Sequence, residues 1–264
     1  MGRKNKTLIT ALAVLLAAGL WGTVGKTNAQ AGQTLDLSSQ MVLDRVRACG
    51  FVTSPPVPYV GTIVGSQDAS GNLSEGDYIY IRLEPGKEVK TGDHLTIARF
   101  AKEVQHPVTK KKMGHALYFP GRAVILDGKG PIVPAIIEKS FTAVIHGDLI
   151  MVSPPSVSPV VPIRMRDGLQ GVILAAAEEE QNISEREVVY IDRGTFDGVI
   201  VGDLFSIYSL PYYTKEESDS NHRPLWKSGE GVVIYVTPET STLLVTDSNQ
   251  GIYAGDVVVS GKGK

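Results

Sequence analysis

Apolar and polar positions alternate along the chain in short runs, and glycine- or proline-containing turns separate the runs. Residues 188–191 and 204–208 are typical, because they are rich in the β-branched and aromatic side chains that strands favour. The pattern predicts about six short strands in each half of the chain. We place them near residues 60–64, 78–82, 94–99, 115–127, 131–138 and 149–152, and near 171–175, 187–192, 204–209, 229–237, 241–246 and 256–259.

The two sets of strands match at a constant offset over much of their length. Residues at turns and strand centres recur, and the pairs include Tyr80/Tyr190, Ile81/Ile191, Gly92/Gly202, Asp93/Asp203 and Ile97/Ile207. After Ile207 the offset drifts, and Gly147-Asp148 then corresponds to Gly255-Asp256. The repeat therefore indicates a shared fold rather than a shared reactive site. We expect an all-β protein with two tandem small β-barrel or sandwich-like modules.

The N-terminal residues have the features of a signal peptide. Arg3, Lys4 and Lys6 precede an apolar stretch over residues 8–20, and small residues at Ala29 and Ala31 suit cleavage after Ala31. This predicts secretion across the inner membrane to the periplasm or the outer-membrane periphery, with no integral membrane segment after cleavage. An uncleaved N-terminal anchor is the alternative.

Proline- and serine-rich stretches divide the remaining chain. We expect a signal peptide over 1–31, a helical leader and proline-rich linker over 32–58, and a first β-module over 59–152. A linker over 153–162 then precedes a second module over 163–264. Apolar residues at helical spacing predict one helix near 38–49, which Gly50 ends.

Charge and cysteine content narrow the classes of partner. The 264 residues carry a net charge of −2, and removal of residues 1–31, which hold four basic and no acidic side chains, leaves a net charge of −6. A mildly acidic chain has no electrostatic reason to bind nucleic acid. The single cysteine, Cys49, forms no intrachain disulfide and suits a buried apolar position.

Candidate catalytic chemistry is sparse, and we expect no enzyme, no cofactor and no metal. The five histidines lack close metal-ligand spacing, and the sequence has no HExxH, CxxC, nucleophile-elbow or phosphate-loop motif. A hydrolase or metal enzyme built from scattered residues such as His106, His115 and Asp127 is the remaining enzymatic hypothesis. Four aspartates could be considered as catalytic acids, but each follows a glycine at a turn, where an aspartate side chain typically stabilises the backbone. These structural turns are Gly92-Asp93, Gly147-Asp148, Gly202-Asp203 and Gly255-Asp256.

Two groups of side chains are weak binding candidates. Lys110, Lys111 and Lys112 lie at the tip of a predicted hairpin, where they are either solvated or in contact with an acidic polymer. Tyr212, Tyr213 and Trp226 flank an acidic loop at the equivalent place in the second module. Exposed aromatic rings there would stack on sugars or contact a protein, whereas buried rings would only support the loop.

One family resemblance rests on residues 190–208, YIDRGTFDGVIVGDLFSIY, and on residues 106–114, HPVTKKKMG. These stretches resemble the β-repeat region of bacterial cell-envelope proteins that carry a LysM peptidoglycan-binding module, and the former is similar to the C-terminal domain of flagellar assembly protein T. The LysM module itself is not evident. The resemblance implies a non-enzymatic structural or interaction protein of the cell envelope, with an envelope protein, peptidoglycan or another glycan as partner. A carbohydrate-binding protein is the alternative.

Overall fold

The computed structural model describes residues 40–54, 57–67, 71–152, 162, 168–178, 182–209 and 226–261. Residues 32–264 form one compact unit, distinct from residues 1–31. The expected signal peptide, most of the linker over 153–162, Tyr212 and Tyr213 lie outside the described residues.

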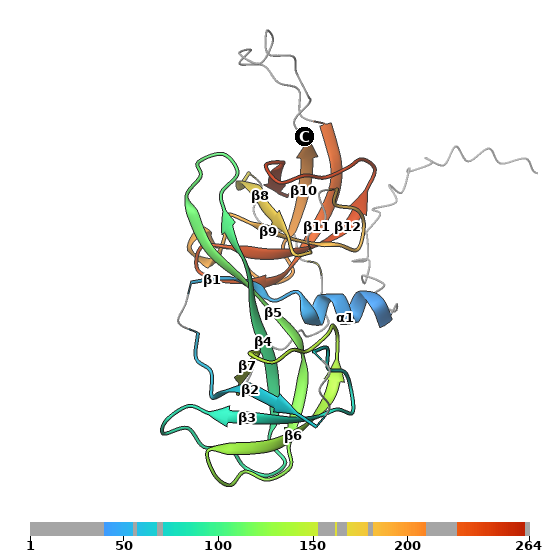
Figure 1. The fold of residues 1–264 in the computed structure, drawn as a ribbon. Helices are drawn as coiled ribbons and strands as arrows, with labels where there is room; N and C mark the ends of the chain where they lie inside the picture. The colour runs from blue at the N-terminus through green and yellow to red at the C-terminus, as the bar shows by residue number, and fades with distance from the viewer. Residues whose placement is uncertain are drawn as a thin grey trace, which may run out of the picture. The chain divides into compact units, whose positions relative to one another are not determined.

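The first module is a ring of six strands with one strand added at its edge (Figure 1). Its strands are β2 (Gly61–Ser66), β3 (Tyr78–Leu83), β4 (His94–Gln105), β5 (Lys112–Ile125), β6 (Ile132–Ser140) and β7 (Leu149–Met151). The sheet runs β5-β4-β7-β2-β3-β6, and a further pairing of β5 with β6 closes the ring. We call this ring the first barrel.

The second module is a closed barrel of the same topology. Its strands are β8 (Gln170–Ala176), β9 (Val188–Ile191), β10 (Leu204–Ser209), β11 (Trp226–Val236), β12 (Ser241–Ser248) and β13 (Val257–Ser260). They pair in the order β10-β11-β12-β9-β8-β13. A short 3-10 helix, η1 (Thr195–Asp197), follows β9. The predicted all-β class, with two small β-modules behind a short helix, is confirmed.

Strand registers give the residue correspondence between the barrels. Tyr80 pairs with Pro134 in the first barrel, and Tyr190 pairs with Thr242 in the second. Ile97 pairs with Gly121, and Ile207 pairs with Gly229. The sequence offset is therefore constant up to β4 and β10, and it is slightly shorter from β5 and β11 onward. The offset therefore changes between residues 99 and 118 in the first module and between residues 209 and 226 in the second.

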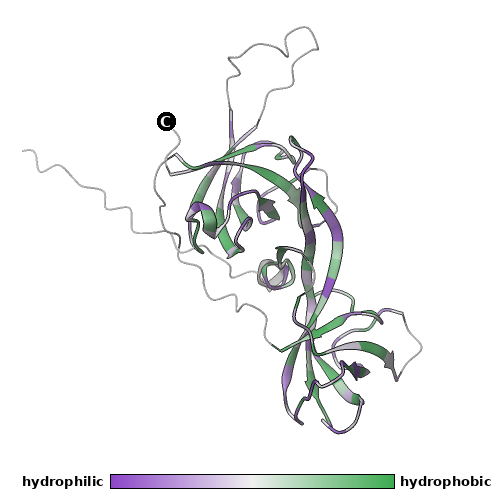
Figure 2. Cartoon of the chain, turned by 90° about the vertical axis from the view of Figure 1, so that its left-hand side faces the viewer, coloured by the Kyte–Doolittle hydropathy of each residue, from purple (hydrophilic) through white to green (hydrophobic). Residues whose placement is uncertain are grey.

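Each barrel has its own apolar core, made by the inward side chains of alternating strands. In the first barrel Ile63, Ile81 and Ile97 are fully buried, and Ile173, Ile191 and Ile207 occupy the corresponding places in the second. Figure 2 shows the hydrophobic stretches along the strands of both barrels. Two separate cores explain why the repeated residues are strand centres.

The two barrels are joined by a seam that the sequence did not predict. It consists of α1 (Gln40–Ala48), β1 (Phe51–Thr53) and the outer half of the β4–β5 hairpin, which reaches from the first barrel to the second (Figure 1). β1 pairs with β5 as an added edge strand, from Phe51 opposite Leu117 to Thr53 opposite His115. The predicted helix near 38–49 is confirmed, and residues 51–53, which the sequence analysis includes in the leader and linker, form β1.

Apolar packing holds the seam together. Val46 and Cys49 cluster with Val188, Ile234 and Leu244 of the second barrel. Further along, residues of β1, β4 and β5 cluster with residues of β8 and β9: Val52, Val104, Ala116, Leu174 and Tyr190. Because the second cluster mixes side chains from both modules, the modules pack against each other rather than hanging on a free linker.

Candidate functional site

The four Gly-Asp turns use their carboxylates to hold the backbone. The glycines have positive φ values of 87°, 94°, 100° and 101° at Gly92, Gly147, Gly202 and Gly255. Each following aspartate accepts a hydrogen bond from the backbone N–H three residues earlier, at 2.7 to 2.9 Å, and the four acceptors are Asp93, Asp148, Asp203 and Asp256. Burial raises the pKa of Asp203, while the bond from Ile200 N–H opposes that rise.

One of these aspartates also forms a partly buried ion pair. Arg99 donates from Nε and Nη2 to the two carboxylate oxygens of Asp148, at 2.5 and 2.6 Å, and from Nη1 to the Tyr118 hydroxyl at 2.8 Å. The Asp148 carboxylate raises the pKa of the Arg99 guanidinium. In the second barrel Ser209 Oγ makes the corresponding contact with Asp256, at 2.9 Å. This pair joins β4 to the Gly-Asp turn and has a structural role.

The histidines of the enzymatic hypothesis do not converge. His106 Nε2 lies 3.3 Å from Asp192 Oδ2 at the seam, whereas the ring of His115 packs edge-on against Phe100 with centroids 6.1 Å apart. Within the described ranges, no three His, Cys, Asp or Glu side chains gather closely enough to hold a metal ion. Burial raises the pKa of the Cys49 thiol far above its usual value, which makes this thiol a poor nucleophile.

The predicted basic tip lies against the second barrel. Lys111 Nζ is 3.6 Å from Glu239, Lys112 Nζ is 2.9 Å from Glu103, and Lys110 Nζ donates to the Pro107 carbonyl at 2.7 Å. The side chains of Lys111 and Lys112 remain more than half exposed, so each contact adds little stability. The three lysines therefore already have partners within the chain.

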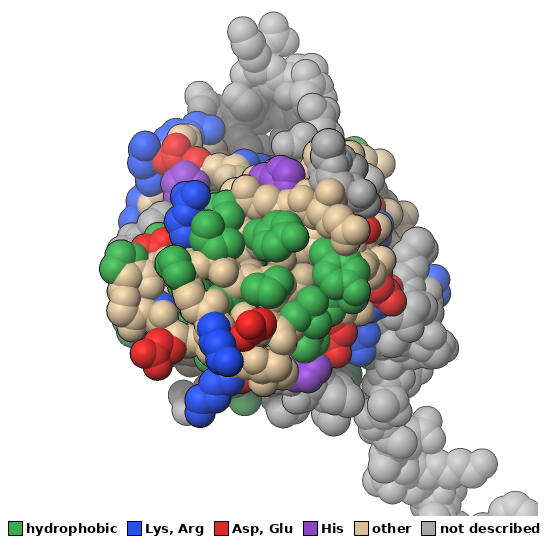
Figure 3. All heavy atoms as spheres, turned by 60° about the horizontal axis from the view of Figure 1, so that its bottom comes forward, with side chains coloured by type: hydrophobic (Ala, Val, Ile, Leu, Met, Phe, Trp, Pro, Cys, Tyr) green, Lys and Arg blue, Asp and Glu red, His purple; other side chains and the backbone are tan. Residues whose placement is uncertain are grey.

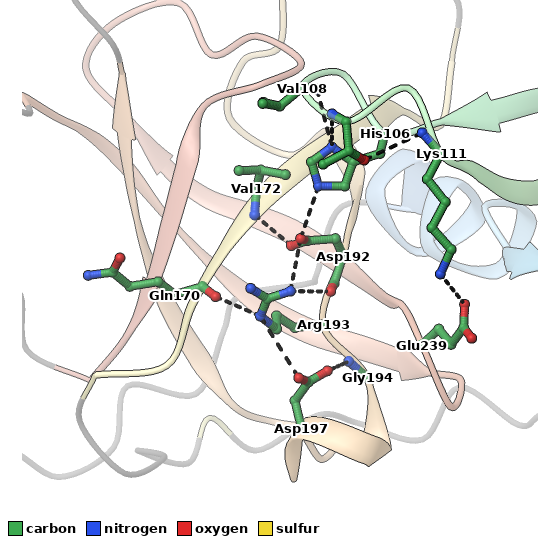
Figure 4. Close-up of polar contacts among 11 residues, drawn as sticks. His106, Val108, Lys111, Gln170, Val172, Asp192, Arg193, Gly194, Asp197 and Glu239 are labelled. Carbon is green, nitrogen blue, oxygen red and sulfur yellow. Dashed lines mark hydrogen bonds and ion pairs between the residues drawn. The ribbon is translucent and has the colours of Figure 1, made fainter.

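Asp192 is the centre of a polar network beside this tip (Figure 4). Its carboxylate accepts hydrogen bonds from Val172 N–H at 2.7 Å and from Arg193 Nη1 at 2.9 Å, and His106 approaches it from the β4–β5 hairpin. Arg193 Nε also donates to the Gln170 carbonyl at 2.6 Å. The network fixes the hairpin to the edge of β8 and β9.

A cavity of about 780 Å³ opens at the seam between the barrels. Asp44, Arg45, Tyr118, Phe141 and Glu178 are among the residues that line it. Arg45 Nε lies 2.9 Å from Glu178 Oε1. Two of the charged lining groups therefore pair with each other, which favours a structural role for the residues around the cavity.

Among the predicted aromatic candidates, the structure describes Trp226. It begins β11 opposite Ser209, and 60% of its surface is exposed. An exposed indole keeps Trp226 as a binding candidate.

The structure also shows a second aromatic surface, which the sequence analysis did not predict. It lies on the outside of the first barrel, over β3, β6 and the end of β5, and we call it the open face. Its six residues are Tyr78, Tyr80, Leu126, Ile132, Pro134 and Ile136. Figure 3, which brings the lower end of Figure 1 forward, shows hydrophobic side chains gathered where β3 and β6 lie.

The repeat shows why this surface is unusual. The exposed fractions of Tyr78 and Tyr80 are 47% and 43%, but those of their counterparts Val188 and Tyr190 are 3% and 0%. The other four counterparts in the second barrel, Ile234, Thr240, Thr242 and Leu244, are also buried. The seam covers this face of the second barrel and leaves the same face of the first barrel open.

The signal for the open face was present in the sequence. An outward strand position normally carries a polar residue, and β3 places tyrosines there. Only the strand register shows that the apolar residues of β6 lie beside these tyrosines on the same side.

Comparisons with known proteins were made by family model and by sequence. No protein-family model matches the sequence, and no curated protein matches it. Over the described residues, no helix is both long enough and apolar enough to cross a membrane.

Proposed function

We propose that the chain is a non-enzymatic structural or interaction protein of the bacterial cell envelope, and that the open face binds a protein partner. The observation that carries the proposal is the difference between the two barrels. Six positions that are buried under the seam in the second barrel carry apolar or aromatic residues in the first, where four are exposed and two, Pro134 and Ile136, are half-buried. A surface that the same fold uses for packing elsewhere in the chain is a suitable interface.

The composition of the open face supports a protein partner. Contiguous exposed apolar patches on soluble proteins mark interaction sites, and tyrosine is enriched among the residues that dominate binding energy. Tyr78 and Tyr80 stand on one strand, flanked by Ile132 and Ile136 of β6. Exposed Arg82 and Lys129 lie close by in the sequence and supply a polar rim.

The cell-envelope setting comes from the sequence. Residues 1–31 have the charge and hydropathy pattern of a signal peptide. The resemblance of residues 106–114 and 190–208 to envelope β-repeats points to the same compartment, the periplasm or the outer-membrane periphery.

Site-specific photo-cross-linking in the cells that produce the protein tests this proposal. A photoreactive phenylalanine derivative at Tyr80 should form a discrete cross-linked product with a protein in the periplasmic fraction. The same derivative at Ile200, which is an exposed apolar position outside the open face, is the matched control. Absence of a product at Tyr80, or equal products at both positions, contradicts a specific protein interface.

Glycan binding is the second candidate, favoured by the exposed Trp226 and by the paired tyrosines. Aromatic faces stack on sugar rings, and Tyr78 and Tyr80 project from one side of β3. Residues 32–264 should then co-sediment with purified peptidoglycan sacculi in a saturable way, and Trp226→Ala or Tyr80→Ala should reduce the bound fraction. Pelleting that both substitutions leave unchanged would exclude these aromatics as a glycan site.

A further inference from the structure

The segment that covers the second barrel indicates which kind of partner suits the open face. Resting on the proposed function, we infer that the partner protein offers an amphipathic α-helix, whose last turn lies on Tyr80 of the first barrel. This helix takes the place that α1 takes on the second barrel. The Tyr80 hydroxyl donates a hydrogen bond to one of its last carbonyl groups.

Within the molecule, α1 packs on the second barrel through one apolar stripe. Val46 and Cys49 are three positions apart, so they share a face of the helix, and they cluster with apolar residues of the barrel. Three of these barrel residues are Val188, Ile234 and Leu244. Their counterparts on the open face are Tyr78, Leu126 and Ile136. The first barrel therefore keeps apolar or aromatic side chains at the positions on which a helix packs in the second.

A tyrosine hydroxyl holds the end of α1. Tyr190 Oη donates to the Cys49 carbonyl at 2.7 Å, and the last carbonyl groups of a helix have no partner within the helix. Gly50, with a φ of 54°, then turns the chain out of the helix. Tyr80 occupies the position of Tyr190 in the first barrel and is exposed, so its hydroxyl can donate the same bond to a helix from another molecule.

The open face keeps the features that hold a helix but not those that hold an extended chain. Beyond α1, Thr242 Oγ1 donates to the Gly50 carbonyl at 2.9 Å, and Thr240 Oγ1 donates to a carbonyl of β1 at 3.4 Å. The counterparts of these threonines in the first barrel are Pro134 and Ile132, which have no hydroxyl. The open face therefore suits a helix with an apolar stripe better than an extended peptide.

Charge beside Tyr80 favours the C-terminal end of the helix. Arg82 lies two residues after Tyr80 on the same side of β3 and is exposed. The C-terminal end of a helix carries a partial negative charge and the N-terminal end a partial positive charge. Arg82 therefore attracts the end that Tyr80 can bind, and the inferred helix has the direction of α1.

The helix comes from another protein. Within the ranges that the structure describes, α1 is the one α-helix, and its Val46 and Cys49 are already buried against the second barrel. A second copy of the chain has its own α1 committed in the same way. Neither copy therefore has a free helix to offer among these residues.

A peptide that copies α1 is the probe. It spans residues 40–50, with Cys49→Ala to prevent disulfide formation and Gln40→Lys to allow a lactam bridge to Asp44, which holds the peptide helical. Circular dichroism verifies its helicity. Fluorescence anisotropy of the labelled peptide measures its affinity for residues 32–264, in which α1 already covers the second barrel. The control peptide has the same bridge and Val46→Asp, which interrupts the apolar stripe.

The wild-type chain should bind one peptide in a saturable way, and the Val46→Asp peptide at least tenfold more weakly. Tyr80→Phe should weaken binding about two- to tenfold, because it removes one hydrogen bond. Arg82→Gln should weaken it about two- to fivefold at low salt and much less at high salt. Tyr253→Phe makes the same change as Tyr80→Phe at an exposed tyrosine of the second barrel and should leave binding unchanged. Unchanged thermal melts verify that each variant folds.

Three results would overturn the inference. They are a wild-type chain that does not bind the peptide, equal binding of the Val46→Asp peptide, and unchanged binding by Tyr80→Phe. Cross-linking at Tyr80 in cells separates this failure from failure of the proposed function, because mass spectrometry should place the link in an amphipathic helix of another protein. A link to a strand or loop, or to a second copy of this chain, would keep the open face as an interface and reject the helix. The absence of any product would reject both.

Discussion

Two tyrosines that correspond in the repeat provide a direct test of the seam. Tyr190 and Tyr80 occupy the same position in the two barrels, yet Tyr190 is fully buried and Tyr80 is nearly half exposed. The Tyr190 hydroxyl donates to the Cys49 carbonyl at 2.7 Å, and this bond ties the end of α1 to the second barrel. Tyr→Phe at each position removes one oxygen atom and changes little else.

The expected costs differ because the surroundings differ. Tyr190→Phe removes the hydroxyl that donates a hydrogen bond to the buried Cys49 carbonyl oxygen. Loss of this bond should lower the free energy of unfolding by about 1–3 kcal/mol. Tyr80→Phe exchanges a hydroxyl that water solvates, so the change should lie within about 0.5 kcal/mol. For a protein of this size, each kcal/mol lowers the melting temperature by about 2–4 °C.

Urea unfolding followed by circular dichroism measures both variants against the wild type. Equal m values would show that the substitutions change stability rather than the surface exposed on unfolding. A Tyr190→Phe variant as stable as the wild type, or a Tyr80→Phe variant equally destabilised, would refute the conclusion that the seam covers this face of the second barrel and leaves that of the first open.

Further substitutions test the turns, the buried thiol and the added strand. Arg99→Ala leaves a buried carboxylate without its cation and should cost about 1.5–3 kcal/mol, whereas Ser209→Ala, at the corresponding position, should cost about 0.5–1.5 kcal/mol in the same urea assay. Burial raises the pKa of Cys49 above its usual 9.0, so the folded chain holds this proton more tightly than the unfolded chain. Stability should be full below pH 9 and fall above it by up to about 1.4 kcal/mol per pH unit, and urea midpoints between pH 8 and 10 should show a shallower fall in Cys49→Ala. Gly114→Ala should destabilise the protein by about 1–3 kcal/mol in thermal melts, because Gly114 has a φ of 118° and a Cβ there would lie 2.6 Å from the Thr53 carbonyl oxygen.

The barrels could be predicted from the sequence because local signals specify them. Gly92-Asp93 and Gly202-Asp203 mark turns by positive φ and by side-chain bonds to the backbone, which are interactions between close neighbours in the chain. The apolar runs that follow them are long enough to define strands. Three of the six pairings in each barrel join strands that follow one another along the chain, such as β2 with β3 and β4 with β5, so for these pairs local pattern and global fold agree.

The seam could not be predicted in this way. β1 has only three residues and precedes two prolines, so its sequence has the composition of a linker. It becomes a strand because β5 extends beyond the first barrel and offers an unpaired edge. The contact of His106 with Asp192 joins residues 86 positions apart, and no spacing rule connects them.

The candidate site escapes prediction for a related reason. Sequence reasoning singles out Trp226 because it flanks a charged loop, whereas it assigns Tyr80 to a strand centre, which the recurrence at Tyr190 explains. The same residue type at the same repeat position has opposite surroundings, because burial here depends on which segment packs outside the barrel. Residues that the two repeats share therefore predict which side chains are buried inside each barrel, but not which outward side chains are covered.

The difference between the barrels also bears on the chemistry of their outer faces. A repeat whose outer face stays in water usually carries polar residues there, because an apolar face invites association. The second barrel has no such need on this face, since α1, β1 and the β4–β5 hairpin cover Tyr190 and Thr242. The first barrel has the uncharged Tyr80 and Pro134 at these positions, and Tyr80 is exposed. This face of the first barrel therefore has the composition of a packing surface, which is the physical reason to look for a binding partner on it.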